Sequence, residues 1–136
     1  MKYVPSLCLA ALASLLPAPL VAAPFDGTQP FICANIEIYA CEPGVKCDEE
    51  TVESIDVPQF LKISVPDKTI VGTRPSGQAV NAKIELVRHV EQKMYLQGVE
   101  KLLGWTVIVD EQTGRMSLTV SDDKNGYVIF GACTGT

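Results

Sequence analysis

The chain has 136 residues and carries 11 Lys and Arg against 16 Asp and Glu, a formal net charge of −5 at pH 7. This length predicts one domain and excludes a multi-domain enzyme, because domains commonly hold ~100–200 residues. The acidic balance excludes nucleic acid as an expected partner, since binding to a phosphate backbone depends on clustered Lys and Arg.

The N-terminal segment has the three-part layout of a secretory signal peptide. An early lysine precedes an apolar run over residues 7–16, and a stretch of small residues follows, ending in Ala22 and Ala23. The run is about half as long as the ~20 apolar residues of a membrane span, so no membrane span is expected after cleavage. Cleavage after Ala22 or Ala23 divides the chain into a signal peptide over 1–23 and a single β-domain over 24–136. The mature protein is therefore expected to be periplasmic or secreted.

Four cysteines remain in the mature chain, at Cys33, Cys41, Cys47 and Cys133. An even number of cysteines in an exported chain predicts two disulfides, for which three pairings exist. Cys33 and Cys41 lie in a predicted strand at a separation of roughly 26 Å, which is beyond the reach of a disulfide. A Pro-Gly turn between Cys41 and Cys47 brings those two together. We therefore expect Cys41–Cys47, and a long-range Cys33–Cys133 bridge between the first and last strands.

Apolar and polar residues alternate along most of the mature chain. In residues 32–40 the even positions are apolar, which predicts a half-buried strand with one apolar face. Turn compositions occur at Pro66-Asp67-Lys68, at residues 110–114 and at residues 122–126, and Gly131 predicts a bulge or a close packing contact. The other predicted strands cover residues 60–65, 69–71, 80–86, 94–99, 104–109, 116–120 and 127–130.

About eight short strands joined by tight turns predict an all-β fold, either a small antiparallel up-and-down barrel or a barrel-like sandwich. The barrel is favoured, because a disulfide between the first and last strands is natural where those strands meet and pair. The one helical candidate is a short turn that Asp48 would cap and that runs to Glu53, with acidic residues in its first turn.

His89 is the only histidine, and the alternation places it on the polar face of the strand from Val80, with Lys83, Glu85 and Glu91. A single exposed histidine is more often a surface residue than a base, and no nucleophile lies at a meaningful spacing from it. No catalytic residue is assigned, and the chain is not expected to be an enzyme.

No metal or cofactor is expected either. Cys41 and Cys47 lack the spacing and the histidine partners of a zinc site, and they are expected to form a disulfide. The densest acidic stretch lacks the alternating oxygen ligands and the glycine of a calcium loop. It is either a solvated face or a surface for a protein partner. Its members are Asp48, Glu49, Glu50 and Glu53.

The barrel interior separates two possible functions. Bulky side chains at every inward position favour a packed core and a partner on the surface, whereas small or polar inward residues favour a cavity. Trp105 shares a face with Val107 and Val109 and is expected to plug the core rather than to form a ligand platform. The composition favours the packed core, but several small residues keep the cavity open as an alternative: Ala34, Ala40, Ala82 and Gly98.

Several stretches of the mature chain invite comparison with known families: Pro30-Phe31-Ile32-Cys33, the Cys41 to Cys47 loop, Leu96 to Glu100 with Gly104-Trp105, Asp110, Thr113-Gly114-Arg115, and Phe130 to Thr134. In these stretches the chain resembles a group of small exported bacterial proteins with no assigned activity. This resemblance spans most of the mature chain and implies no functional residues. In layout alone, the chain is also similar to periplasmic inhibitors of lysozyme and of proteases, which are small antiparallel barrels, some with a disulfide between the chain ends.

The expected function is that of an exported, non-enzymatic binding protein with a protein partner, and inhibition of a secreted hydrolase is one concrete form of it. The first alternative is a lipocalin-like carrier of a small apolar ligand. A second alternative is a structural periplasmic factor. The sequence leaves the identity of the partner and the oligomeric state open.

Overall fold

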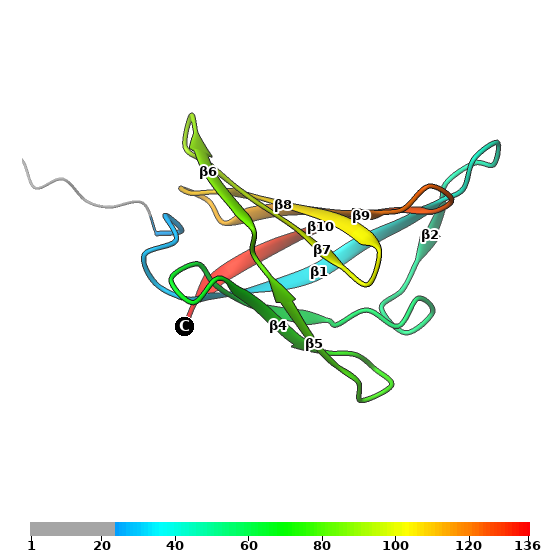
Figure 1. Ribbon diagram of the computed structural model, residues 1–136, viewed down its shortest axis with the longest axis horizontal. Helices are drawn as coiled ribbons and strands as arrows, with labels where there is room; N and C mark the ends of the chain where they lie inside the picture. The colour runs from blue at the N-terminus through cyan, green and yellow to red at the C-terminus, as the bar shows by residue number, and fades with distance from the viewer. Residues whose placement is uncertain (1–23) are drawn as a thin grey trace, which may run out of the picture.

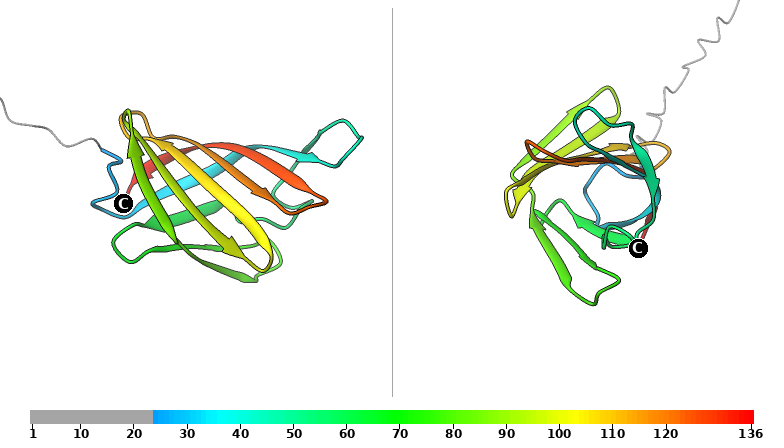
Figure 2. Two further views of the ribbon diagram at one scale, coloured as in Figure 1. Left: turned by 45° about the horizontal axis from the view of Figure 1, so that its top comes forward. Right: turned by 90° about the vertical axis from the view of Figure 1, so that its right-hand side faces the viewer.

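The computed structural model describes residues 24–136, so the predicted signal peptide lies outside the described residues. These residues form an all-antiparallel β-sheet that curls on itself into a half-barrel (Figures 1 and 2). The strands are β1 (Phe31–Cys41), β2 (Asp48–Glu50), β3 (Phe60–Ser64), β4 (Thr69–Thr73), β5 (Ala79–Lys83), β6 (Leu86–Val90), β7 (Lys93–Glu100), β8 (Leu103–Asp110), β9 (Arg115–Ser121) and β10 (Gly126–Gly135). The predicted all-β, barrel-like fold is confirmed.

The strand order is that of an up-and-down meander in which the first strand pairs with the last. Along the sheet the order is β5-β4-β3-β1-β10-β9-β8-β7-β6, and the short β2 adds to β1 beside this path. In Figure 1, β1 and β10 run next to each other through the middle of the molecule. The two free edges are therefore β5 and β6, which are neighbours in sequence.

The predicted strand over residues 80–86 is divided, because the chain changes partners at Ile84 and Glu85. The Ile84 amide donates to the Lys68 carbonyl (2.9 Å), and the Glu85 amide donates to the Gln97 carbonyl (2.9 Å). Before this point β5 pairs with β4, and after it β6 pairs with β7. This division and the addition of β2 account for ten strands where eight were expected.

Both predicted disulfides are present. Cys33 and Cys133 are directly opposite each other in the β1–β10 pair and are bonded, at a sequence separation of 100. Cys41 and Cys47 close a loop that extends beyond the barrel, at the upper right of Figure 1. We call residues 41–47 the projecting loop. Stable disulfides of this kind indicate an oxidising compartment.

The first half of β1 faces the opposite way from the prediction. Phe31, Cys33 and Asn35 are buried, whereas Ile36 is 64% exposed and Ile38 is buried. The pairing with β10 shifts register between Asn35 and Glu37, so a β-bulge at Ile36 reverses the alternation. The even positions face inward only after this bulge.

The predicted helical turn over residues 48–53 is absent. Asp48 to Glu50 form β2, which pairs with Ile38 to Ala40 of β1, and a turn over residues 52–56 follows. The capping motif is overridden because pairing with β1 satisfies the backbone of residues 48–50, and because the disulfide holds the start of β2 beside the end of β1. Residues 24–136 contain no helix that is long and apolar enough to cross a membrane.

The core lies inside the curl and is closed at one end by the N-terminal residues. Phe25 packs edge to face on Phe31 with ring centroids 6.0 Å apart, and its amide donates to the Glu111 carbonyl (3.1 Å). Met94, Leu96, Val107 and Val109 are fully buried. The opposite end of the barrel, where the β4–β5 and β7–β8 turns lie, is less tightly filled and holds the candidate site.

Candidate ligand-binding cavity

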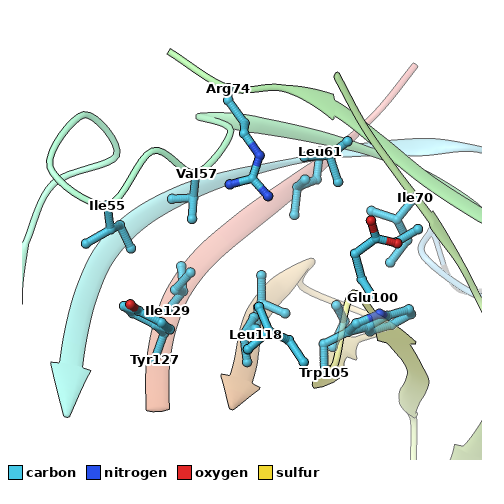
Figure 3. A pocket seen from close by; sticks show the side chains of 15 residues that line it. Ile55, Val57, Leu61, Ile70, Arg74, Glu100, Trp105, Leu118, Tyr127 and Ile129 are labelled. Atoms are coloured by element: carbon cyan, nitrogen blue, oxygen red, sulfur yellow. The ribbon is translucent and has the colours of Figure 1, made fainter. Parts of the chain in front are cut away.

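A cavity of about 240 Å³ lies inside the curled sheet, between the β3–β5 wall and the β8–β10 wall. Figure 3 shows the side chains of both walls converging on it, with Ile55 and Val57 of the segment between β2 and β3 at its side. Most of the lining is aliphatic or aromatic, and three charged or phenolic side chains, Arg74, Glu100 and Tyr127, also line it. The other lining residues are Leu61, Ile70, Val80, Ala82, Leu103, Trp105, Val107, Leu118, Val120 and Ile129.

The cavity exists because β5 diverges from the end of β7. The two segments are close at Gly98, where a Cβ atom would lie 2.5 Å from the Lys83 carbonyl oxygen. Beyond this point the chain has no ladder between β5 and the last residues of β7, and both Val80 and Glu100 line the cavity. The opening is therefore a wedge with Gly98 at its apex.

Trp105 forms part of the cavity wall and is 7% exposed. Its ring lies across Gly98, since a Cβ atom there would be 2.4 Å from the ring atom Cζ2. The indole Nε1 is buried and has no hydrogen-bond partner among the described residues. The expectation that Trp105 is a core residue is correct for its burial, but its ring borders empty space on one side. An unpaired buried N–H is rare in proteins and indicates a missing acceptor.

Arg74 follows β4 directly, and its guanidinium points into the cavity (Figure 3). One guanidinium nitrogen donates to the main-chain carbonyl of Asp56, and the guanidinium donates to no other described residue. The Asp56 carboxylate accepts hydrogen bonds from the Ser76 amide (2.9 Å) and hydroxyl (2.8 Å). These two bonds, with a smaller contribution from the charge of Arg74, hold the pKa of Asp56 below its usual value. This network connects the β4–β5 loop, which carries Arg74, to the turn over residues 52–56.

Glu100 ends β7 and extends its carboxyl group into the cavity on the side of Ile70 and Trp105 (Figure 3). Glu100 forms no ion pair with Arg74. Among residues 24–136, the oppositely charged side-chain contacts are His89–Glu111 and Lys93–Asp110. The cavity thus carries a cation on one wall and an anion on the other, with aliphatic side chains between them.

The acidic residues and the histidine singled out from the sequence lie away from this cavity, whereas Ala82 and Trp105 line it. Asp48 and Glu49 are exposed on β2, and Glu53 is exposed in the turn that follows. Glu50 is half-buried and accepts a hydrogen bond from the Ser54 hydroxyl (2.5 Å). The four acidic side chains therefore lie beside the projecting loop on the outside of the barrel.

His89 lies on the edge strand β6, and its Nδ1 is 2.5 Å from Oε1 of Glu111. The His89 side chain is 48% exposed and that of Glu111 is 13% exposed. His89 was expected to share one continuous strand with Lys83. This prediction is wrong, because the strand is divided at residue 84. Its partner Glu111 comes from the β8–β9 turn. Within residues 24–136, no group of three or more His, Cys, Asp or Glu side chains is placed to hold a metal ion.

Comparison with known proteins returned no match. No family model fits the chain, and neither a curated protein nor a solved structure is significantly similar to it. The cavity and its side chains are therefore interpreted on their own chemistry.

Sequence reasoning missed Arg74 and Glu100. Arg74 lies in the loop between β4 and β5, where alternation does not indicate the direction of a side chain. Glu100 follows Val99 in a strand whose inward positions are even, so its inward direction could have been read from the run Met94, Leu96, Gly98. Glu100, a charged residue at the end of an otherwise apolar strand face, was therefore the one feature of the sequence that could have indicated a polar group in the cavity.

Proposed function

We propose that the mature protein is a binding protein that holds a small, predominantly apolar molecule inside the half-barrel. The observation that carries the proposal is the apolar cavity whose walls also carry the polar side chains of Arg74 and Glu100. Binding sites for small molecules are typically apolar clefts with a few placed polar groups, and their volumes are roughly 300–1,000 Å³ for drug-sized ligands. A cavity of about 240 Å³ suits a smaller molecule.

The volume of about 240 Å³ exceeds the space that a single water molecule needs and has room for a short aliphatic chain. An unbranched chain of about eight carbons is a suitable probe for such a cavity. Because an apolar ligand would replace the empty space beside aliphatic side chains, it would gain the dispersion contacts that these side chains lack.

Binding of 1-octanol tests the proposal, with Trp105 as the reporter because it is the only tryptophan of the chain. We expect saturable changes in Trp105 emission and a matching heat of binding by calorimetry. Ala82→Leu should weaken the binding at least about tenfold, since Ala82 lines the cavity and a larger side chain would fill it. Ala79→Leu is the matched control, because Ala79 is exposed on the same strand. Equal binding by both variants, or none by the wild type, would contradict the proposal.

We propose further that the protein works in the periplasm or outside the cell. The signal-peptide layout of residues 1–23 and the two disulfides support this. Mass spectrometry of the exported protein should give an N-terminus at Ala23 or Pro24. An intact Met1 in a membrane fraction would contradict it.

Inhibition of a secreted hydrolase is a second proposal, and the projecting loop favours it. Its residues 42–47 are exposed, Val45 is 61% exposed, and the Cys41–Cys47 disulfide closes the loop away from the barrel (Figure 2). A loop that is already constrained loses less conformational entropy when it enters a cleft. We expect Val45→Asp to abolish inhibition of lysozyme or trypsin, and Val99→Asp, at another exposed site, to leave it unchanged. No inhibition by the wild-type protein at high concentration would rule out these two hydrolases as targets.

A further inference from the structure

Arg74 and Trp105 each bring hydrogen-bond donors to the residues that line the cavity. Arg74 uses one guanidinium nitrogen for the Asp56 carbonyl, and its other N–H groups donate to no described residue. The buried Nε1 of Trp105 is also a donor without an acceptor. Acceptor oxygens on a bound molecule would therefore find free N–H groups at Arg74.

The charges that face Arg74 decide the sign of the ligand. The nearby Asp56 carboxylate already accepts two hydrogen bonds from Ser76, and no described acidic side chain forms an ion pair with Arg74. A guanidinium beside apolar walls is partly desolvated, and its planar N–H groups match the two oxygens of a carboxylate. Glu100 is on the other wall, so a negative group is favoured near Arg74 and disfavoured near Glu100.

We propose that the ligand is an aliphatic monocarboxylate of medium chain length, whose carboxylate pairs with Arg74 inside the cavity. This inference rests on the proposed function, because it assigns the chemical class of the molecule in the same cavity. The chain of the ligand lies along Leu61, which is between Arg74 and Glu100, and along Leu118 and Ile129 across the cavity from Arg74 (Figure 3).

Three eight-carbon probes with different head groups test the class: octanoate, 1-octanol and octylamine. Titrations at pH 7 are followed by Trp105 emission and by calorimetry. We expect octanoate to bind at least about tenfold more tightly than 1-octanol, because hydrogen bonds to a charged group are the stronger kind. Octylamine should bind more weakly than either. A preference for octylamine, or equal binding of octanoate and 1-octanol, would overturn the inference.

Two variants connect the preference to Arg74. Arg74→Gln should lower the preference for octanoate over 1-octanol at least about tenfold, while Arg115→Gln, at an exposed position of β9, should leave it unchanged. Glu100→Gln should raise the affinity for octanoate, since it removes the negative charge on the other wall. If Arg74→Gln does not fold, the affinity of Glu100→Gln for octanoate and the order of the three probes on the wild-type protein still test the carboxylate assignment.

The outcomes separate this inference from the function on which it rests. If none of the three probes binds to the wild-type protein, the proposed function itself fails. If 1-octanol binds but Arg74→Gln leaves the preference for octanoate unchanged, the cavity remains a binding site and only the carboxylate assignment is wrong.

Discussion

Gly98 allows Trp105 to border the cavity, and Gly98→Ala should therefore disturb both stability and binding. Gly98 is opposite Trp105 in the β7–β8 pair. A Cβ atom at this position would lie 2.4 Å from Cζ2 and 2.8 Å from Cε2 of Trp105, and 2.5 Å from the carbonyl oxygen of Lys83. The carbonyl belongs to the backbone at the apex of the wedge and cannot move alone. The indole ring must therefore shift.

The size of the effect follows from overpacking. Forcing a methyl group into a filled position costs typically about 1–3 kcal/mol, and contacts on two sides place Gly98→Ala in the upper half of this range. Because the ring must move away from β7 and towards the open space, the cavity becomes smaller. The affinity for 1-octanol should then fall together with the free energy of unfolding.

Urea unfolding followed by circular dichroism measures this effect without using the tryptophan signal. Gly104→Ala is the matched control, because the nearest atom to a Cβ there is 3.9 Å away. Alanine is favoured over glycine in a strand, so Gly104→Ala should be neutral or stabilising by up to about 1 kcal/mol. If Gly98→Ala were as stable as Gly104→Ala, the packing of the indole ring on β7 would be refuted.

Three further predictions concern the disulfides, the β8–β9 turn and the single histidine. Replacing both Cys33 and Cys133 by Ala should lower the free energy of unfolding by about 4.7 kcal/mol in the chain-entropy model. Replacing both Cys41 and Cys47 by Ala should lower it by about 2.4 kcal/mol, because this bridge closes a much shorter loop. Urea unfolding of the two double variants measures both values. The amide and then the hydroxyl of Thr113 lower the pKa of Asp110 to about 2. This folded-state value is below the unfolded one, so the contribution of Asp110 to stability is complete above about pH 4 and is lost as the pH falls towards 2. Asp110→Asn should therefore lower the unfolding free energy more at pH 7 than at pH 2, and an equal loss at both would contradict this. His89→Ala should change the unfolding free energy by about 0.5 kcal/mol or less, since the His89 side chain is 48% exposed. A loss above about 2 kcal/mol would contradict a surface role.

Strands and several turns of this protein can be predicted from short stretches of sequence. The alternation in residues 94–99 and 104–109 corresponds to β7 and β8. Pro66 and Asp67 form the predicted turn, closed by a hydrogen bond from the Lys68 amide to the Val65 carbonyl (3.1 Å). These features depend on the conformational preferences of a few adjacent residues, so the sequence determines them locally.

Other turns carry no local signal. Glu91 and Gln92, and likewise Lys101 and Leu102, have positive φ values in two-residue hairpin turns, although neither pair contains the Gly, Asn or Asp that such turns favour. The pairing of the strands on either side of each turn imposes this backbone conformation. Tertiary structure therefore decides these turns against the local preference.

The inward face of β1 and the cavity depend on contacts between residues that are far apart in sequence. At the bulge, a Cβ atom on Gly131 would lie 2.0 Å from the Ala34 carbonyl oxygen, so the close approach of β10 accompanies the reversal at Ile36. Arg74 points inward because the Asp56 carbonyl holds it, and the wedge opens because β5 and β7 separate beyond Gly98. Alternation in the sequence determines that one face of a strand is apolar. The register and the divergence of the strands determine which residues meet across the barrel and whether they fill it. Only the folded chain sets these two properties, because the strands that meet are far apart in the sequence.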